Sequence, residues 1–432
     1  MKLDKKDLTK GNNFVTFGCK LNSYETEGIK NLCDSVGLLN TTVINSCAVT
    51  AEAVRKTKRH IRKSKKETPN NKIIVTGCAA QIDPKMFSEM KEVDSVIGNS
   101  EKRSKSIWKK IAKNSQKPFD KRYVKVEDIF KLKSEKLSSL PVNGIGSRSR
   151  AYVQIQNGCD HRCTFCIIPF ARGNSRSIEA KDIIKQIETL VIEGFREVTL
   201  TGVDITSWGR DLPGSPKLGF LVKEILASTP NLLRLRLSSI DQVEVDEDLI
   251  NIMMTSSRLM PHLHLSFQSG DNLILKRMKR RHCREDIVKF CDRLRSRRPE
   301  FVFGADIIVG FPTETDEMFK NTFELVSRCQ ITWLHVFPFS ARNGTPAARM
   351  PKVNEKSIRM RAKTLRELGS SMIKSYLSDQ IGKTQPVLME STHKGRTEGF
   401  AEVTTAVEMP VGEIVNLRIS GSNGSQLIGT PA

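Results

Sequence analysis

Residues 152–166 read YVQIQNGCDHRCTFC, a β-strand candidate that runs directly into a group of three cysteines. Thiolates are soft ligands that suit an iron–sulfur cluster or zinc. A structural zinc site normally takes four protein ligands, and His161 is the nearby residue that could be the fourth. A four-iron cluster held by Cys159, Cys163 and Cys166 would instead keep one iron open to an outside ligand. The residues alone leave both interpretations open.

Strand candidates alternate with amphipathic helical stretches downstream of this motif. The strands are expected at 152–156, 197–201, 233–237, 262–267, 302–309 and 332–337, with helices such as 183–193, 249–254 and 317–328 between them. Six βα units predict an α/β domain over 151–375, an incomplete (βα)6 TIM-like barrel, with its chemistry at the C-terminal ends of the strands.

Upstream of the motif, three short apolar runs share one layout. The runs 14–19, 42–47 and 73–78 each end on a cysteine, and a helical stretch follows each of them. This alternation predicts a parallel-sheet domain over 1–117, and the strand C-termini of such a sheet share one edge. We therefore expect Cys19, Cys47 and Cys78 to converge. Residues 118–150 are expected to form a linker with one short strand near 123–126.

The C-terminal part changes pattern again. A polar helix at about 355–377 is followed by short apolar runs at 386–389, 399–404 and 411–419, separated by Gly, Ser and Asn. This pattern predicts a small closed β-barrel over 376–432. Lys383, His393, Lys394 and Arg396 give it a modest positive surface, although a plain packing domain would look the same.

Composition indicates a polyanionic partner. Lys and Arg number 70 against 48 Asp and Glu, a net charge of +22, which favours nucleic-acid contact over a charge kept for solubility. No apolar stretch approaches the roughly 20 residues of a membrane span, and residues 1–10 contain no signal core, so we expect a cytoplasmic protein. Ten cysteines in a reducing compartment are metal ligands or buried thiols. The cysteines in helical patterns are expected to be buried: Cys33, Cys283, Cys291 and Cys329.

The C-x3-C-x2-C spacing, with Phe165 before the last cysteine, resembles the radical S-adenosylmethionine (SAM) superfamily. The resemblance implies that the open iron binds SAM and that an electron from the cluster cleaves SAM to a 5′-deoxyadenosyl radical, so no side chain is nominated as acid or base. It also implies SAM contacts at strand ends, where a glycine could equally serve a turn. The predicted cofactor-binding residues are Gly202, Asp204, Ser266, Gln268, Ile308 and Gly310.

The three-part arrangement looks like the methylthiotransferase family. That resemblance implies a second, auxiliary [4Fe–4S] cluster at Cys19, Cys47 and Cys78, a C-terminal TRAM-like RNA-binding barrel, and a reductant such as flavodoxin or ferredoxin. The segments 18–22 (GCKLN), 44–50 (INSCAVT) and 201–205 (TGVDI) resemble the branch that adds a methylthio group to C2 of N6-threonylcarbamoyladenosine 37 in tRNA. The expected partner is a tRNA anticodon stem-loop, with no DNA and no membrane.

Two basic runs, 55–66 and 276–281, and the C-terminal barrel are predicted to contact RNA phosphates, although a solvated charged face is the usual explanation of such runs. The predicted RNA-binding residues are Arg55, Lys58, Arg59, Arg62, Arg277, Arg280, Lys394 and Arg396. Three alternatives stay open. The substrate could be isopentenyl-adenosine tRNA or a ribosomal protein, or the chain could be a non-catalytic iron–sulfur RNA-binding sensor.

Overall fold

The computed structural model describes residues 11–114, 123–131, 140 and 149–432, so most of the expected linker lies outside the described residues. The chain divides into two compact units. The first comprises Met1–Asn143, Asn157–His161 and Cys166–Arg176, and the second Gly144–Gln156, Arg162–Phe165 and Ser177–Ala432. Each unit is described separately below.

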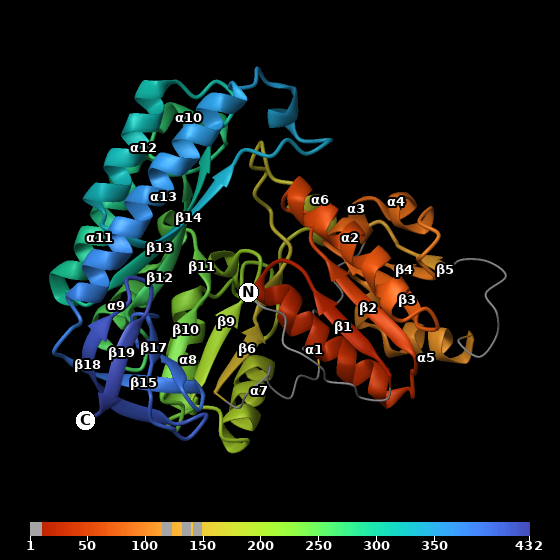
Figure 1. Cartoon of the computed structure of the whole chain (residues 1–432), viewed down its shortest axis with the longest axis horizontal. Helices are drawn as coiled ribbons and strands as arrows, with labels where there is room; N and C mark the ends of the chain where they lie inside the picture. Colours follow the sequence, from red (N-terminus) through yellow and green to blue (C-terminus); the bar gives the residue numbers. More distant parts are fainter. Residues whose placement is uncertain (1–10, 115–122, 132–139, 141–148) are drawn as a thin grey trace. The chain divides into compact units, whose positions relative to one another are not determined.

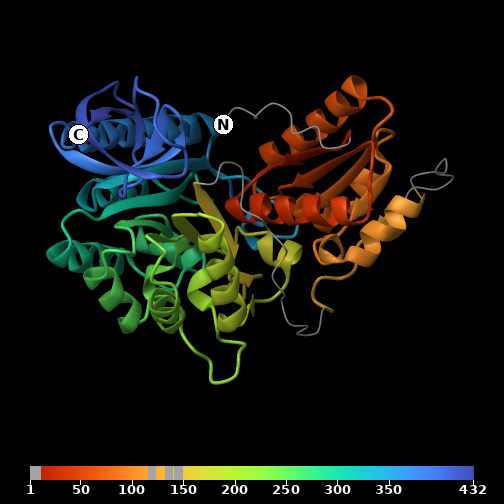
Figure 2. The same cartoon turned by 90° about the horizontal axis from the view of Figure 1, so that it is seen from below.

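The first unit is built on a parallel sheet in the order β1-β2-β3-β4-β5, and Figure 2 shows helices on both of its faces. Because both faces are covered, β2 is buried along its whole length and β3 at every residue after the first, with Val43, Ile44 and Ile73–Val75 as their apolar centre. The strands are β1 (Asn13–Thr16), β2 (Thr41–Ser46), β3 (Lys72–Gly77), β4 (Ser95–Ile97) and β5 (Tyr123–Lys125). The helices are α1 (Lys20–Ser35), α2 (Ala51–Glu67), α3 (Cys78–Ile82), α4 (Pro84–Ser88), η1 (Glu101–Arg103), α5 (Lys105–Asn114) and α6 (Ile168–Arg172).

The second unit contains the predicted incomplete barrel, which is confirmed. Its parallel strands form the sheets β10-β9-β6 and β11-β12-β13-β14. Only Ser238 separates β10 from β11, so together they fill one of six strand positions. The strands are β6 (Arg150–Gln154), β9 (Glu197–Thr201), β10 (Arg234–Leu237), β11 (Ser239–Ile240), β12 (His262–Gln268), β13 (Val302–Val309) and β14 (Ile331–Pro338) (Figure 1).

Amphipathic helices cover the outer face of this barrel because each presents an apolar stripe to the strands. They are α7 (Ala180–Ile192), α8 (Leu218–Ser228), α9 (Glu247–Thr255), α10 (Asn272–Arg277), α11 (Arg284–Arg297), α12 (Asp316–Arg328) and α13 (Glu355–Ser378). The short elements β7 (Gln156–Asn157), β8 (Arg176–Ser177), η2 (Ile205–Ser207), η3 (Gln242–Glu244) and η4 (Pro346–Arg349) lie in the connections. None of the described helices is long and apolar enough to cross a membrane.

The C-terminal strands close into the small β-barrel that the sequence predicted, in the order β15-β16-β17-β19-β18. They are β15 (Thr384–Ser391), β16 (Lys394–Arg396), β17 (Glu402–Thr404), β18 (Ile414–Ser422) and β19 (Leu427–Pro431). The interior is filled by Val387, Val403, Leu417 and Leu427. Strands β16 and β19 were not expected, since the first is only three residues long and the second carries a glycine and a proline.

The small barrel packs against the starting ends of the larger barrel's strands (Figure 1). Arg234 donates to the carbonyl oxygen of Pro386 at 2.7 Å, and Arg236 donates to those of Thr397 and Glu398 at 3.0 and 2.7 Å. The opposite strand ends, where barrel chemistry takes place, stay clear of this packing.

Candidate functional site

The N-terminal cysteines lie at the carboxyl edge of the five-stranded sheet. Cys19 caps α1, Cys47 follows β2, and Cys78 begins α3. Burial, together with the neighbouring thiols of Cys78 and Cys19, raises the pKa of Cys47 to about 12, so the three sulfurs are near one another. Gly18 has a φ of +104°, and a Cβ there would lie 2.9 Å from the sulfur of Cys47. A glycine is therefore required where these two loops meet.

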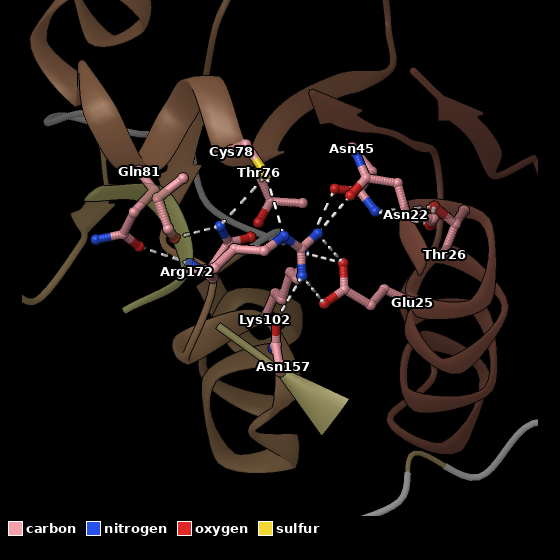
Figure 3. Close-up of polar contacts among 12 residues, drawn as sticks. Asn22, Glu25, Thr26, Asn45, Thr76, Cys78, Gln81, Lys102, Asn157 and Arg172 are labelled. Carbon is pink, nitrogen blue, oxygen red and sulfur yellow. Dashed lines mark hydrogen bonds and ion pairs between the residues drawn. The ribbon is translucent and has the colours of Figure 1, made fainter. Parts of the chain in front are cut away.

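Arg172, the last residue of α6, contacts this group of thiols directly (Figure 3). Its Nε donates to Cys78 Sγ at 3.3 Å. Its Nη1 and Nη2 donate to the two carboxylate oxygens of Glu25, both at 2.9 Å. The same two nitrogens also donate to Asn22 Oδ1 at 2.5 Å and to Asn157 Oδ1 at 3.1 Å. The guanidinium is thus fixed from several sides beside a cysteine sulfur.

A second buried cation shares the carboxylate. Lys102 Nζ donates to Glu25 Oε2 at 2.6 Å and to Asn45 Oδ1 at 3.5 Å. Burial alone would raise the pKa of Glu25, but Arg172 and then Lys102 hold that pKa well below its usual range. The side chains of Glu25, Lys102 and Arg172 are each at most 2% exposed. Burial lowers the pKa of Lys102, but Glu25 opposes that shift; with Lys102 protonated in its ion pair, two cations face one anion and the buried cluster is net positive.

This charge fits the group that the cysteines would hold. A buried net charge is costly unless an opposite charge lies next to it. A resting four-iron cluster bound by three thiolates carries a net negative charge, whereas three protonated thiols carry none. Because Arg172 donates to Cys78 itself, the donor set and the surrounding charge both suit an anionic metal–thiolate group.

Cys159, Cys163 and Cys166 lie between β7 and α6, so they stay within one short loop. The backbone N–H of Cys159 donates to Gly173 O at 3.0 Å. The buried thiol of Cys163 lies 3.6 Å from Nη1 of Arg280. An arginine N–H therefore faces one sulfur in each set of three cysteines.

The structure corrects the prediction that Arg280 contacts RNA. The sequence placed it in a basic run facing RNA, but its side chain is only 8% exposed. Its Nη2 donates to Asp241 Oδ2 at 2.7 Å and to Ser266 O at 2.5 Å. The guanidinium is turned inward to bind a carboxylate and a strand end, so it is not available to an RNA phosphate.

The residues predicted to contact SAM all lie at or near the C-terminal ends of barrel strands. Gly202 and Asp204 follow β9, and Gln156 Oε1 accepts from the backbone N–H of Asp204 at 2.9 Å. The backbone N–H of Gly310 donates to Glu314 Oε2 at 2.8 Å. The remaining three lie on β12 and β13, namely Ser266, Gln268 and Ile308. Their contacts with SAM stay a prediction.

Of the residues predicted to bind RNA, those on α2 are the most available. Arg55, Arg59 and Arg62 are exposed and Lys58 is partly so, because the buried stripe of α2 runs through Thr57, Ile61 and Ser64. We call Arg55, Lys58, Arg59 and Arg62 the α2 basic face.

The predicted RNA contacts outside α2 also have protein partners, as Arg55 on α2 has in Glu52. Arg277 donates to Thr313 Oγ1 at 2.7 Å. Arg396 lies 4.8 Å from the ring centre of Phe400 and pairs with Glu402 at 3.2 Å, which ties it to the small barrel. Lys394 is more exposed, with Glu402 at 3.6 Å.

Sequence reasoning missed Arg172, Glu25 and Lys102. Arg172 follows the cysteine motif closely, and that position was the one available signal; the other two stand in polar runs without periodicity. The prediction that Cys283 is buried is wrong. This residue caps α11 and is half-buried, with its sulfur 3.1 Å from Asp286 Oδ2, whereas Cys33, Cys291 and Cys329 are buried as expected.

Comparisons with known proteins agree with the fold and with the two sets of cysteines. Residues 153–326 match the radical SAM superfamily, and residues 12–98 match an uncharacterized protein family, UPF0004. The threonylcarbamoyladenosine tRNA methylthiotransferase MtaB of Rickettsia prowazekii (strain Madrid E) is 47% identical over 407 residues, which cover 94% of each chain. The tRNA-2-methylthio-N(6)-dimethylallyladenosine synthase of Carboxydothermus hydrogenoformans (strain ATCC BAA-161 / DSM 6008 / Z-2901) is 31% identical, over 94% of this chain and 96% of its own.

A solved structure supports the fold. The radical SAM methyltransferase TsrM from Kitasatospora setae matches with a TM-score of 0.59 at 13% identity, covering 79% of this chain and 77% of its own.

Proposed function

The chain belongs to the radical SAM family of threonylcarbamoyladenosine tRNA methylthiotransferases, and on that basis we propose that it adds a methylthio group to C2 of N6-threonylcarbamoyladenosine 37 in tRNA. The observation that carries the proposal is 47% identity to such an enzyme over 94% of both chains. Identity to a dimethylallyladenosine synthase is lower, at 31%, which favours the threonylcarbamoyl substrate. SAM and a [4Fe–4S] cluster are the cofactors of this chemistry.

We assign two clusters to the six cysteines. Cys159, Cys163 and Cys166 would hold the first and Cys19, Cys47 and Cys78 the auxiliary one. When bound, the first supplies the electron that cleaves SAM and the second supplies the site from which the methylthio group is transferred. The chain's own part is to hold and shield them.

Two arginines assist this role. Arg280 places a cation beside Cys163 and Arg172 places one beside Cys78, which stabilises thiolates over thiols. No side chain is needed as a base, because C2–H of adenosine is far too weak an acid for one.

We infer that phosphate contacts position the RNA, and that the anticodon loop is recognised by its shape, its backbone and a splayed-out base. The α2 basic face begins just after Cys47, so its phosphate contacts would set the register of the anticodon stem near that cysteine. The small C-terminal barrel, with Lys394 on its surface, is the second proposed RNA contact. A small reductant protein such as flavodoxin or ferredoxin would supply electrons. The cytoplasm, where tRNA is modified, is the proposed location.

The test is nucleoside mass spectrometry of tRNA from a strain that lacks this gene. We expect 2-methylthio-N6-threonylcarbamoyladenosine to disappear while N6-threonylcarbamoyladenosine accumulates. The intact gene should restore the product and a Cys163→Ala copy should not, since Cys163 is a proposed ligand. Unchanged tRNA accompanied by an altered ribosomal protein would point to the alternative substrate and contradict the proposal.

A further inference from the structure

The pocket beside Cys78 contains more positive than negative charge. Arg172 and Lys102 share the carboxylate of Glu25, and all three side chains are buried (Figure 3). Burial lowers the pKa of Lys102, whereas Glu25 and Cys78 act to raise it. An anionic group bound at Cys78 would therefore favour the charged form of both cations.

Two buried N–H groups also point at the sulfur of Cys78. Arg172 Nε donates to it at 3.3 Å, and Asn99 Nδ2 donates to it at 3.9 Å. The amide of Asn99 is held in place by a second bond, from Nδ2 to the carbonyl oxygen of Ala171 at 2.8 Å. Hydrogen bonds to the ligand sulfurs and nearby charge are two of the factors that set the reduction potential of an iron–sulfur cluster.

The pocket beside Cys163 has a different balance of charge. Arg280 Nη1 donates to the sulfur at 3.6 Å, but Asp241 pairs with the same guanidinium at 2.7 Å. Burial alone would lower the pKa of Arg280, but Asp241 and Asp204 are among the groups that raise it, so both carboxylates act on the guanidinium. One cation therefore faces two carboxylates there, in contrast to two cations and one carboxylate beside Cys78.

Solvent exposure does not distinguish the two sets of cysteines, because each set contains at least one cysteine that is not buried. The charge of the surrounding side chains is thus the clearest difference between the two sites. Reduction adds one negative charge to a four-iron cluster. A net positive pocket stabilises the reduced form, and a pocket without excess positive charge does so less.

Building on the two clusters of the proposed function, we propose that Arg172 and Lys102 raise the reduction potential of the auxiliary cluster above that of the first cluster. Glu25 orients both cations and offsets part of their charge, so it limits the shift. The pocket beside Cys163 leaves the first cluster at a lower potential, which suits the donation of an electron to SAM.

The test is an anaerobic redox titration of the reconstituted full-length enzyme, followed by electron paramagnetic resonance. We expect two separate one-electron reductions in the intact protein. The reduction at higher potential should be missing from the variant Cys19→Ala/Cys47→Ala/Cys78→Ala, which assigns it to the auxiliary cluster.

Two variants of the same ion pair separate charge from stability. Lys102→Met removes one cation while Arg172 keeps both bonds to Glu25, so reduction of the auxiliary cluster should become about tenfold less favourable, a fall of 59 mV for one electron. Glu25→Gln breaks the same ion pair but removes the anion, so it should not lower the potential. Lys85→Met removes an exposed charge on α4 and should leave both potentials unchanged.

A fourth variant tests the hydrogen bond alone. Asn99→Leu removes the second N–H donor at Cys78 and keeps all three buried charges, so it should lower the potential of the auxiliary cluster by less than Lys102→Met does. This variant gives a result even where an ion-pair variant loses iron.

The outcomes separate the two proposals. If the intact enzyme shows two reductions but the first cluster has the higher potential, the proposed tuning is overturned and the two-cluster function stands. Equal falls in Lys102→Met and Glu25→Gln, or no fall in both Lys102→Met and Asn99→Leu, would overturn it as well. If the intact enzyme shows a single reduction that survives loss of the three N-terminal cysteines, the assignment of two clusters itself fails.

Discussion

Arg172→Ala is expected to destabilise the N-terminal unit by about 3–5 kcal/mol, the usual cost of breaking a buried ion pair. The change removes both bonds to Glu25 and leaves Asn22 and Asn157 with polar atoms to satisfy in a buried place. It also removes the donor at Cys78. We therefore expect the variant to lose iron at the auxiliary site. Anaerobic urea unfolding and iron analysis measure the two effects.

Arg172→Lys is the matched control. It keeps the positive charge but cannot form the two-pronged contact with Glu25, so stability and iron content should fall between those of the intact protein and the alanine variant. An alanine variant with full stability and unchanged iron would show that the buried charge cluster does not support the site.

Glu197→Ala is expected to lower the free energy of unfolding by about 3–5 kcal/mol, because it breaks a buried ion-pair group at the base of the larger barrel. Glu197 is fully buried at the start of β9 and pairs with Arg150, with Arg236 at 2.8 Å and with Arg234 at 3.9 Å. Removing it leaves the three arginines without the carboxylate that they share. Because Arg234 and Arg236 also hold the small barrel, limited proteolysis should release that barrel sooner in the variant.

A surface pair at the same junction gives the control. Arg196 and Glu413 lie 3.1 Å apart and are 37% and 50% exposed, so Glu413→Ala should cost no more than about 1 kcal/mol. Equal losses of unfolding free energy in Glu197→Ala and Glu413→Ala would contradict the stabilising role given to the buried Glu197 group.

Acid should remove the stabilisation that the ionised Glu197 side chain provides. Burial alone would raise its pKa, but Arg236, Arg150 and Arg234 lower the pKa to about 2. The stabilisation is complete above the unfolded carboxyl pKa of about 4.3 and is lost as pH falls toward the folded value. The stability difference between intact protein and Glu197→Ala should therefore shrink below about pH 4.

The sequence was most informative where one residue type carries the signal. The strand candidates at 197–201 and 302–309 match β9 and β13 at their observed bounds, because β-branched and apolar residues dominate both and suit a buried parallel strand. Cysteines at the ends of such runs were expected to converge, and those of the first unit do.

Charged residues were harder to place from sequence. Arg280 stands in a basic run that looks solvent-facing, yet it is buried because Asp241, far away in sequence, lies beside it. Arg172, Glu25 and Lys102 meet from three separate segments, and no local pattern marks such a meeting. The side chains of His264, Asp306 and His335 also meet only once their three strands are in register.

The central claim is that the two sets of cysteines hold two clusters with different tasks. The most direct measurement is iron per chain, together with 5′-deoxyadenosine and methylthiolated tRNA, in the anaerobically reconstituted enzyme. We expect about eight irons in the intact protein, and about four in a Cys19→Ala/Cys47→Ala/Cys78→Ala variant that still makes 5′-deoxyadenosine but no methylthiolated tRNA. Only four irons in the intact protein, or continued methylthiolation by the variant, would contradict it.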